Sequence, residues 1–66
     1  SRVELTAKLF KGREEITQGL AYQWYNNEGD ISGETNPTYV IEDINFNENG
    51  YIQYGCKITA GLKEET

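Results

Sequence analysis

The chain has 66 residues and a mass of 7.5 kDa, so it can form one hydrophobic core but not a second. Apolar residues make up 36% and charged residues 26%, which argues against both a disordered and a membrane-spanning segment. A core this small rarely supplies more than about 3 to 5 kcal/mol, and a neighbouring chain, a metal or disulfides often add to it. Length therefore excludes a separate catalytic domain and predicts a single domain over residues 1–66.

Charge and side-chain chemistry exclude several function classes. Eleven acidic and six basic residues give a net charge of −5, and the bases are scattered, which disfavours nucleic acids and anionic membranes as partners. With no His and one Cys, the chain cannot assemble a zinc site or a His-activated nucleophile. We therefore expect no enzymatic activity, no metal and no cofactor. Cys56 alone cannot form an internal disulfide.

Alternation of apolar and polar residues predicts strands in most of the chain. Long strands are expected at residues 2–10, 20–26, 38–42 and 51–60, with short strand pieces at 16–17 and 31–32. Turn residues separate them, and the link at 43–50 has room for one helical turn. Residues 60–66 are expected to be frayed or to form a linker. The pattern predicts an all-β fold, either a sandwich or a small barrel.

Aromatic and small residues on these strands suggest a particular sandwich. Trp24 lies on the second long strand, Cys56 on the last, and Tyr54 two residues before that Cys. This arrangement resembles the immunoglobulin-like β-sandwich with Greek-key connections, in which a Trp packs against the link between two facing strands. The resemblance implies that Leu5 or Ala7 replaces the partner Cys, with Ala7 facing Cys56, and that Cys56 is buried. It also implies that the Tyr54 hydroxyl bonds to backbone around residues 47–50.

The apolar residues of the predicted strands define an expected core around Trp24. It comprises Leu5, Ala7, Trp24, Tyr39, Ile41, Tyr54 and Cys56.

A narrower resemblance covers residues 22–59. Its motifs are Tyr22-Gln23-Trp24-Tyr25, the hairpin Ile31-Ser32-Gly33, the strand Thr38-Tyr39-Val40-Ile41 and the closing Tyr54-Gly55-Cys56-Lys57-Ile58-Thr59. In this order and spacing they resemble the immunoglobulin-like modules of tailed-phage virion proteins and bacterial surface proteins. The resemblance implies a structural or adhesive module located in a phage tail or capsid surface, or on the bacterial cell surface.

The chain is shorter than full modules of this kind, which have roughly 80 to 100 residues. The strands expected before Val3 and after Gly61 are absent or vestigial in the sequence. Their absence would leave sheet edges open, and open edges pair with an available strand. We therefore expect the parent polypeptide, or a neighbouring virion or surface subunit, to complete the sandwich.

Three other functions remain open from the sequence. Tyr25 and Tyr51 could present ring faces to a cell-surface glycan, so a carbohydrate-binding module is the main alternative. The turn at residues 27–30, with Glu34, offers oxygen ligands for Ca²⁺ but lacks the spacing of a dedicated calcium loop. An excised or designed scaffold without activity is the third.

Two further features of the sequence have simpler interpretations. The carboxylate pairs Glu14-Glu15 and Glu42-Asp43 are expected to be solvated loop faces rather than acid/base groups. Cys56 is expected to be an inert, buried thiol, because Lys57 points to the opposite face of its strand.

Overall fold

The computed structural model describes residues 2–42 and 52–61, and every regular element in this part is a β-strand. The strands are β1 (Val3–Thr6), β2 (Leu9–Lys11), β3 (Glu14–Ile16), β4 (Leu20–Asn26), β5 (Gly29–Asp30), β6 (Thr38–Ile41) and β7 (Tyr54–Ala60). The predicted all-β class is confirmed for these residues. The described part contains no helix long and apolar enough to cross a membrane.

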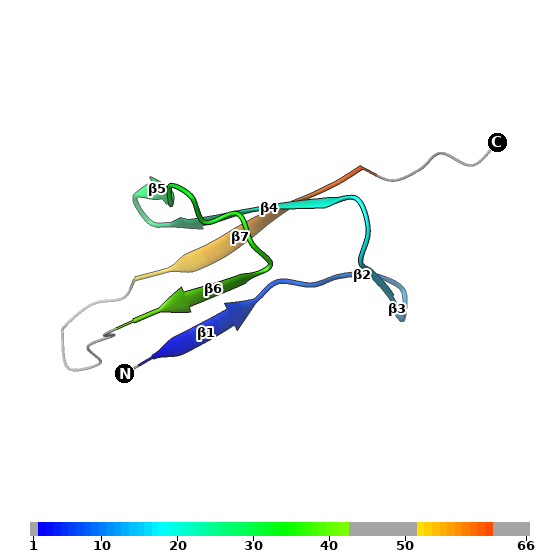
Figure 1. Ribbon diagram of the computed structural model, residues 1–66, viewed down its shortest axis with the longest axis horizontal. Helices are drawn as coiled ribbons and strands as arrows, with labels where there is room; N and C mark the ends of the chain where they lie inside the picture. The colour runs from blue at the N-terminus through cyan, green and yellow to red at the C-terminus, as the bar shows by residue number, and fades with distance from the viewer. Residues whose placement is uncertain (1, 43–51, 62–66) are drawn as a thin grey trace.

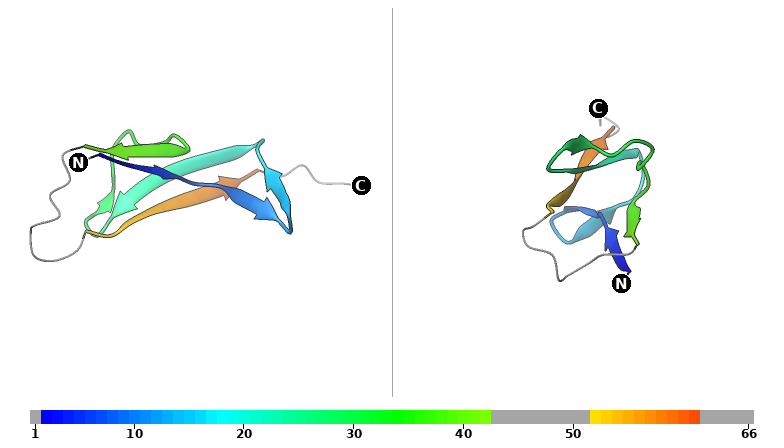
Figure 2. Two further views of the ribbon diagram at one scale, coloured as in Figure 1. Left: turned by 90° about the horizontal axis from the view of Figure 1, so that it is seen from below. Right: turned by 90° about the vertical axis from the view of Figure 1, so that its left-hand side faces the viewer.

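The strands form three small antiparallel sheets (Figure 1). β1 pairs with β6, and β4 lies between β5 and β7 in a three-stranded sheet. β2 and β3 form a separate hairpin, whose two-residue turn begins with Gly12 at a φ of 63°. A positive φ suits Gly at the first turn position of a tight hairpin. Figure 2 shows the β1–β6 pair lying across the β4–β7 pair, which gives two layers.

The predicted strand boundaries need several corrections. The strand expected over residues 2–10 is two strands. The Ala7 N–H donates to the Pro37 carbonyl at 2.8 Å in the register of the β1–β6 ladder, but Pro37 has no N–H to donate in return, so the pairing ends there. The last strand begins at Tyr54 instead of residue 51. Residues 60 and 61 are not frayed, since Ala60 belongs to β7 and the Gly61 N–H donates to the Gly19 carbonyl at 2.8 Å. The expectations for residues 43–51 and 62–66 lie outside the described residues.

The core is centred on Trp24, as predicted. Trp24 is 4% exposed and is the buried hydrophobic residue of the described part. Its ring lies 5.7 Å from that of Tyr39, which lies 5.8 Å from the Tyr54 ring, so this aromatic row joins β4, β6 and β7. Tilted ring pairs at such distances add stability beyond their burial.

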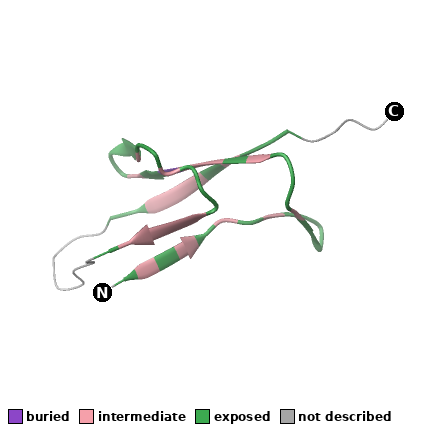
Figure 3. Ribbon diagram, in the orientation of Figure 1, coloured by how far each residue is buried: buried purple, intermediate pink, exposed green. Residues whose placement is uncertain are grey.

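The remaining predicted core residues are half-buried (Figure 3). They are Leu5, Ala7, Tyr39, Ile41, Tyr54 and Cys56. The expectation that Cys56 is buried is therefore wrong. Among the described strands, the short β1 and β6 form the layer opposite β4 and β7, and they cannot cover the whole inner face. Within its sheet, Cys56 is the cross-strand partner of Trp24.

All three polar groups of Trp24 form hydrogen bonds to the segment 31–36. The backbone N–H of Trp24 donates to the Glu34 carbonyl at 3.0 Å, and its carbonyl accepts from the Ile31 N–H at 2.9 Å. Its indole N–H donates to the Asn36 carbonyl at 2.7 Å. The side-chain amide of Gln23 adds bonds of 2.8 and 2.9 Å to the carbonyls of Trp24 and Ile31. This segment therefore covers the edge of β4 that faces away from β7.

Candidate functional site

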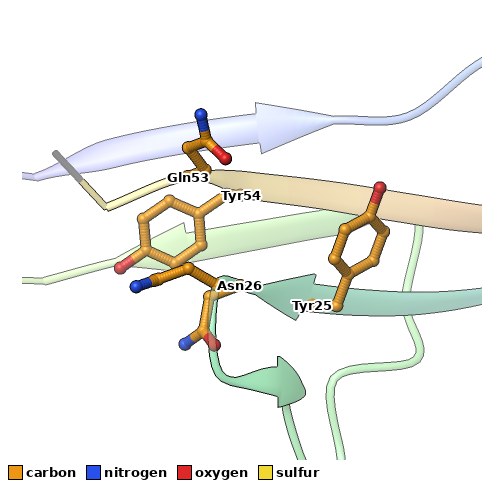
Figure 4. Close-up of a pocket in the computed structure, with 5 residues that line it drawn as sticks. Tyr25, Asn26, Gln53 and Tyr54 are labelled. Atoms are coloured by element: carbon orange, nitrogen blue, oxygen red, sulfur yellow. The ribbon is translucent and has the colours of Figure 1, made fainter.

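An open hollow of about 540 Å³ lies where the end of β4 meets the start of β7. Two tyrosines and three carboxamide side chains line it: Tyr25, Asn26, Asn27, Gln53 and Tyr54. Figure 4 shows Tyr25 and Asn26 coming from β4, Tyr54 from the first position of β7, and Gln53 from the residue just before it. Among the described residues that line it, none is charged. We call this the sheet-end hollow.

The β4–β7 ladder brings these residues together. Asn26 and Tyr54 are cross-strand partners at the last position of the ladder, so their side chains lie on the same face of the sheet. The Tyr54 ring packs on Tyr39 on its inner side. The Oδ1 atom of Asn26 accepts a 2.8 Å hydrogen bond from the Glu28 backbone N–H, which fixes the turn after β4. The amide N–H groups of Asn26 are then directed away from that turn bond.

Tyr25 is held on the other face of the same sheet. It lies opposite Gly55 in the ladder, and a Cβ atom at Gly55 would overlap with the ring of Tyr25. Lys57 Nζ is 5.9 Å from the ring centroid and 2.7 Å from Asp30 Oδ1. The ring remains 38% exposed. Gly55 thus provides the flat floor on which Tyr25 rests, an arrangement in which an aromatic ring covers a strand glycine.

One titratable group beside the hollow is perturbed. Burial raises the pKa of the Tyr39 phenol above its ordinary value, and the neighbouring Tyr54 and Glu34 raise it further. Desolvation and nearby negative charge both oppose formation of the phenolate. Tyr39 therefore acts as a neutral aromatic support behind Tyr54.

The structure brings together some of the predicted site residues. Tyr25 and Tyr54 both line the sheet-end hollow, whereas Tyr51 lies outside the described residues. Leu5 and Ile41 belong to the β1–β6 pair and are not among the residues that line the hollow. The carboxamides of Asn26, Asn27 and Gln53 were not predicted. From sequence alone they read as turn and strand-end residues, and only the β4–β7 register places them side by side.

The alternative acidic site is not supported by the described contacts. Asp30, a proposed calcium ligand, forms an ion pair with Lys57. Within residues 2–42 and 52–61, no three acidic or Cys side chains lie close enough together to hold a metal ion. Glu42 pairs with Arg2 at 3.6 Å, and Asp43 lies outside the described range.

The backbone edge of β7 is the second candidate contact surface. Because the Trp24 N–H and carbonyl both bond to the segment 31–34, they point away from β7. The direction of the backbone N–H and carbonyl groups alternates along a strand, so those of Tyr25, Gln23 and Ala21 point toward β7. Their partners are Gly55, Lys57 and Thr59.

The same alternation defines the free backbone groups of β7. The N–H and carbonyl groups of Cys56, Ile58 and Ala60 point away from β4. No described strand pairs with β7 on that side. The part of the structure that is described therefore presents an open sheet edge seven residues long.

Comparison of the chain with protein-family models, with curated protein sequences and with solved structures gave no match.

Proposed function

We propose that this chain is a non-enzymatic, immunoglobulin-like structural module that acts by binding neighbouring polypeptide. The strand pairings support this proposal. In an immunoglobulin-like sandwich the second strand pairs with the fifth and the third with the sixth, in opposite layers. Pairing of β1 with β6 and of β4 with β7 corresponds to that arrangement, with Trp24 between the layers.

The open edge of β7 is the observation on which the proposed function rests. It is long, contains no Pro and has one charged residue, Lys57, whose charge is paired with Asp30. Natural edge strands are usually shortened, charged or covered, which prevents pairing with other chains. The edge of β4 is covered by the segment 31–36, but β7 has no such cover among the described residues. An added strand would use the free groups of Cys56, Ile58 and Ala60.

The proposed setting is a phage virion or the bacterial cell surface, where the module serves as a spacer or decoration domain. The motifs of residues 22–59 support this setting, because they resemble modules of such proteins in order and spacing. The proposed partner is the parent polypeptide or a neighbouring subunit. Neither a cofactor nor a catalytic residue is part of the proposal.

A strand-addition experiment tests the binding mode. The probe is a synthetic peptide that alternates threonine and valine between terminal lysines, added to the 66-residue chain. The peptide is expected to raise the melting temperature, because only the folded chain offers the edge. A peptide with proline in place of the central valine should have no effect, since proline cannot donate to the ladder.

Chemical synthesis of the chain allows a matched control. N-methylation of the Ile58 amide blocks a free donor and leaves the β4–β7 ladder intact, so this variant should fold but lose the response to the peptide. N-methylation of Thr59 removes a donor that points toward β4 and should destabilise the chain itself. An equal response of the Ile58-methylated chain, or of the parent chain to the proline peptide, would contradict strand addition at β7.

The flanking sequence in the encoding reading frame tests the setting. Adjacent immunoglobulin-like repeats, or a tail, capsid or cell-surface domain, are expected. A catalytic domain with this segment inside its fold would overturn the proposed role as a spacer.

A further inference from the structure

The sheet-end hollow combines a volume and a chemistry that suit a small neutral ligand. At about 540 Å³ it falls within the range of ligand pockets, roughly 300 to 1,000 Å³. It shares Tyr54 with the first position of β7, but the free backbone groups that strand addition would use belong to Cys56, Ile58 and Ala60. Ligand binding in the hollow can therefore be tested separately from strand addition.

Three carboxamides determine which ligand chemistry fits. Each carboxamide of Asn26, Asn27 and Gln53 carries both donors and an acceptor, a combination that matches hydroxyl groups, which also donate and accept. The Oδ1 atom of Asn26 is occupied by Glu28, so this residue would serve as a donor. The described lining contains no charged group, and the whole chain has a net charge of −5. The site therefore disfavours anionic ligands.

Each face of the sheet carries one tyrosine at the hollow. Tyr54 packs on Tyr39 on the inner face, and Tyr25 lies over Gly55 on the other face. Rings held in place lose little freedom when a ligand packs on them. A pyranose ring has an apolar C–H face and a rim of hydroxyl groups, so it can contact a tyrosine ring and the carboxamides together.

We propose that the sheet-end hollow binds a neutral pyranose unit of a glycan. Tyr25, which is 38% exposed, contacts the apolar face of the sugar, and the carboxamides that line the hollow bind its hydroxyl groups. Because the hollow is open and holds one sugar unit, a single site binds weakly, with a dissociation constant of about 1 mM. Repeated modules on one particle would raise the avidity of such a weak site.

Titration of the isotope-labelled chain, followed by NMR, tests the proposal. The probes are maltopentaose and cellopentaose, with hexagalacturonate as an anionic comparison. At least one neutral probe is expected to cause saturable shifts of the side-chain amide signals of Asn26, Asn27 and Gln53. The Gln23 amide should not respond, because it is bonded internally to two carbonyls. No saturable shift with either neutral probe, or equally strong binding of hexagalacturonate, would overturn the proposal.

Variants locate the binding site. Gln53→Ala and Asn27→Ala change exposed residues outside the strands, so both should fold, and each should weaken binding by about fivefold through the loss of a hydrogen bond. Gln18→Ala is the matched control, since Gln18 is an exposed amide before the opposite end of β4. Unchanged affinity in both hollow variants, or an equal loss in Gln18→Ala, would contradict this site. Neither result bears on the edge of β7, which the strand-addition experiment tests separately.

Discussion

The indole N–H of Trp24 donates a 2.7 Å hydrogen bond to the backbone carbonyl of Asn36, 12 residues further along the chain. The same Trp provides the buried centre between the layers and the backbone groups that hold the segment 31–34. Side-chain burial and loop position therefore depend on one residue. A mutation at this position should affect the core and the cover of the β4 edge together.

Substitutions at Trp24 should separate these contributions. Trp24→Ala is expected to cost about 3 to 5 kcal/mol, which is comparable to the whole stability of a domain this small, so the variant should be unfolded. Trp24→Phe keeps a ring but loses the bond to Asn36 and should cost about 1 kcal/mol from that bond. Urea denaturation followed by circular dichroism measures both values.

Phe10→Ala is the control for the loss of an aromatic side chain. Phe10 is 53% exposed on the β2–β3 hairpin, so its removal should cost much less than that of Trp24. A folded Trp24→Ala variant of near-normal stability would show that the core is not centred on this residue.

Substitution of Gly55 should displace the ring of Tyr25. In Gly55→Ala the new Cβ would overlap with the outer end of this ring, which is 38% exposed and can turn away, so we expect a loss of at most about 1 kcal/mol. In a Tyr25→Ala background the same substitution should be neutral or slightly stabilising, because Ala is otherwise preferred to Gly in a strand. A double-mutant cycle of unfolding free energies measures the difference. Equal costs in the two backgrounds would mean that the ring does not rest on Gly55.

Alkaline pH should destabilise the chain through Tyr39. The pKa of this phenol is raised in the folded state above its ordinary value of 10.0. Its contribution to stability is complete below pH 10.0 and is lost as the pH rises toward the folded pKa, because the unfolded chain releases the proton first. Tyr39→Phe should reduce this pH-dependent loss. Urea midpoints of both proteins across that range test the expectation, and identical pH profiles would contradict it.

The ion pair of Lys57 and Asp30 should contribute little to stability. Although its N–O distance is 2.7 Å, the two side chains are 59% and 53% exposed. Exposed pairs contribute about 0 to 1 kcal/mol and are screened by salt. Lys57→Met and Asp30→Asn should each change the unfolding free energy by less than about 1 kcal/mol, and less still in high salt. A loss above about 2 kcal/mol would show that the pair is a structural constraint.

Local sequence patterns were sufficient for the all-β class and for Trp24, but not for every short piece: a strand was expected at residues 31–32, whereas the structure has β5 at Gly29–Asp30. The alternation of residue types that begins at Leu20 and the turn residues after Asn26 are properties of short segments. The strand β4 ends at Asn26, as those turn residues predict. The break at Ala7 was not predictable in this way, because it depends on the register that places Ala7 opposite Pro37, a distant residue with no N–H to continue the ladder. Partial exposure of Cys56 likewise depends on the short facing layer that β1 and β6 form in the described part of the chain.

The sheet-end hollow was predicted only through Tyr25. Its carboxamides come from both sides of the β4–β7 ladder, and the pairing of Asn26 with Tyr54 is a long-range register that no local pattern contains. The open edge of β7 also depends on long-range contacts. The bonds of Trp24 to the segment 31–34, and not the sequence of β7 itself, determine which amides of β7 are free.

Amide hydrogen exchange along β7 tests the central claim most directly. The account predicts an alternating pattern in the monomeric chain. The backbone amides of Gly55, Lys57 and Thr59 point toward β4 and should exchange slowly. Those of Cys56, Ile58 and Ala60 point to the open edge and should exchange fast. Slow exchange at all six amides would mean that the edge is already covered, and the opposite alternation would mean that the register of β4 and β7 is wrong. Either result would contradict a module that binds neighbouring polypeptide at the edge of β7.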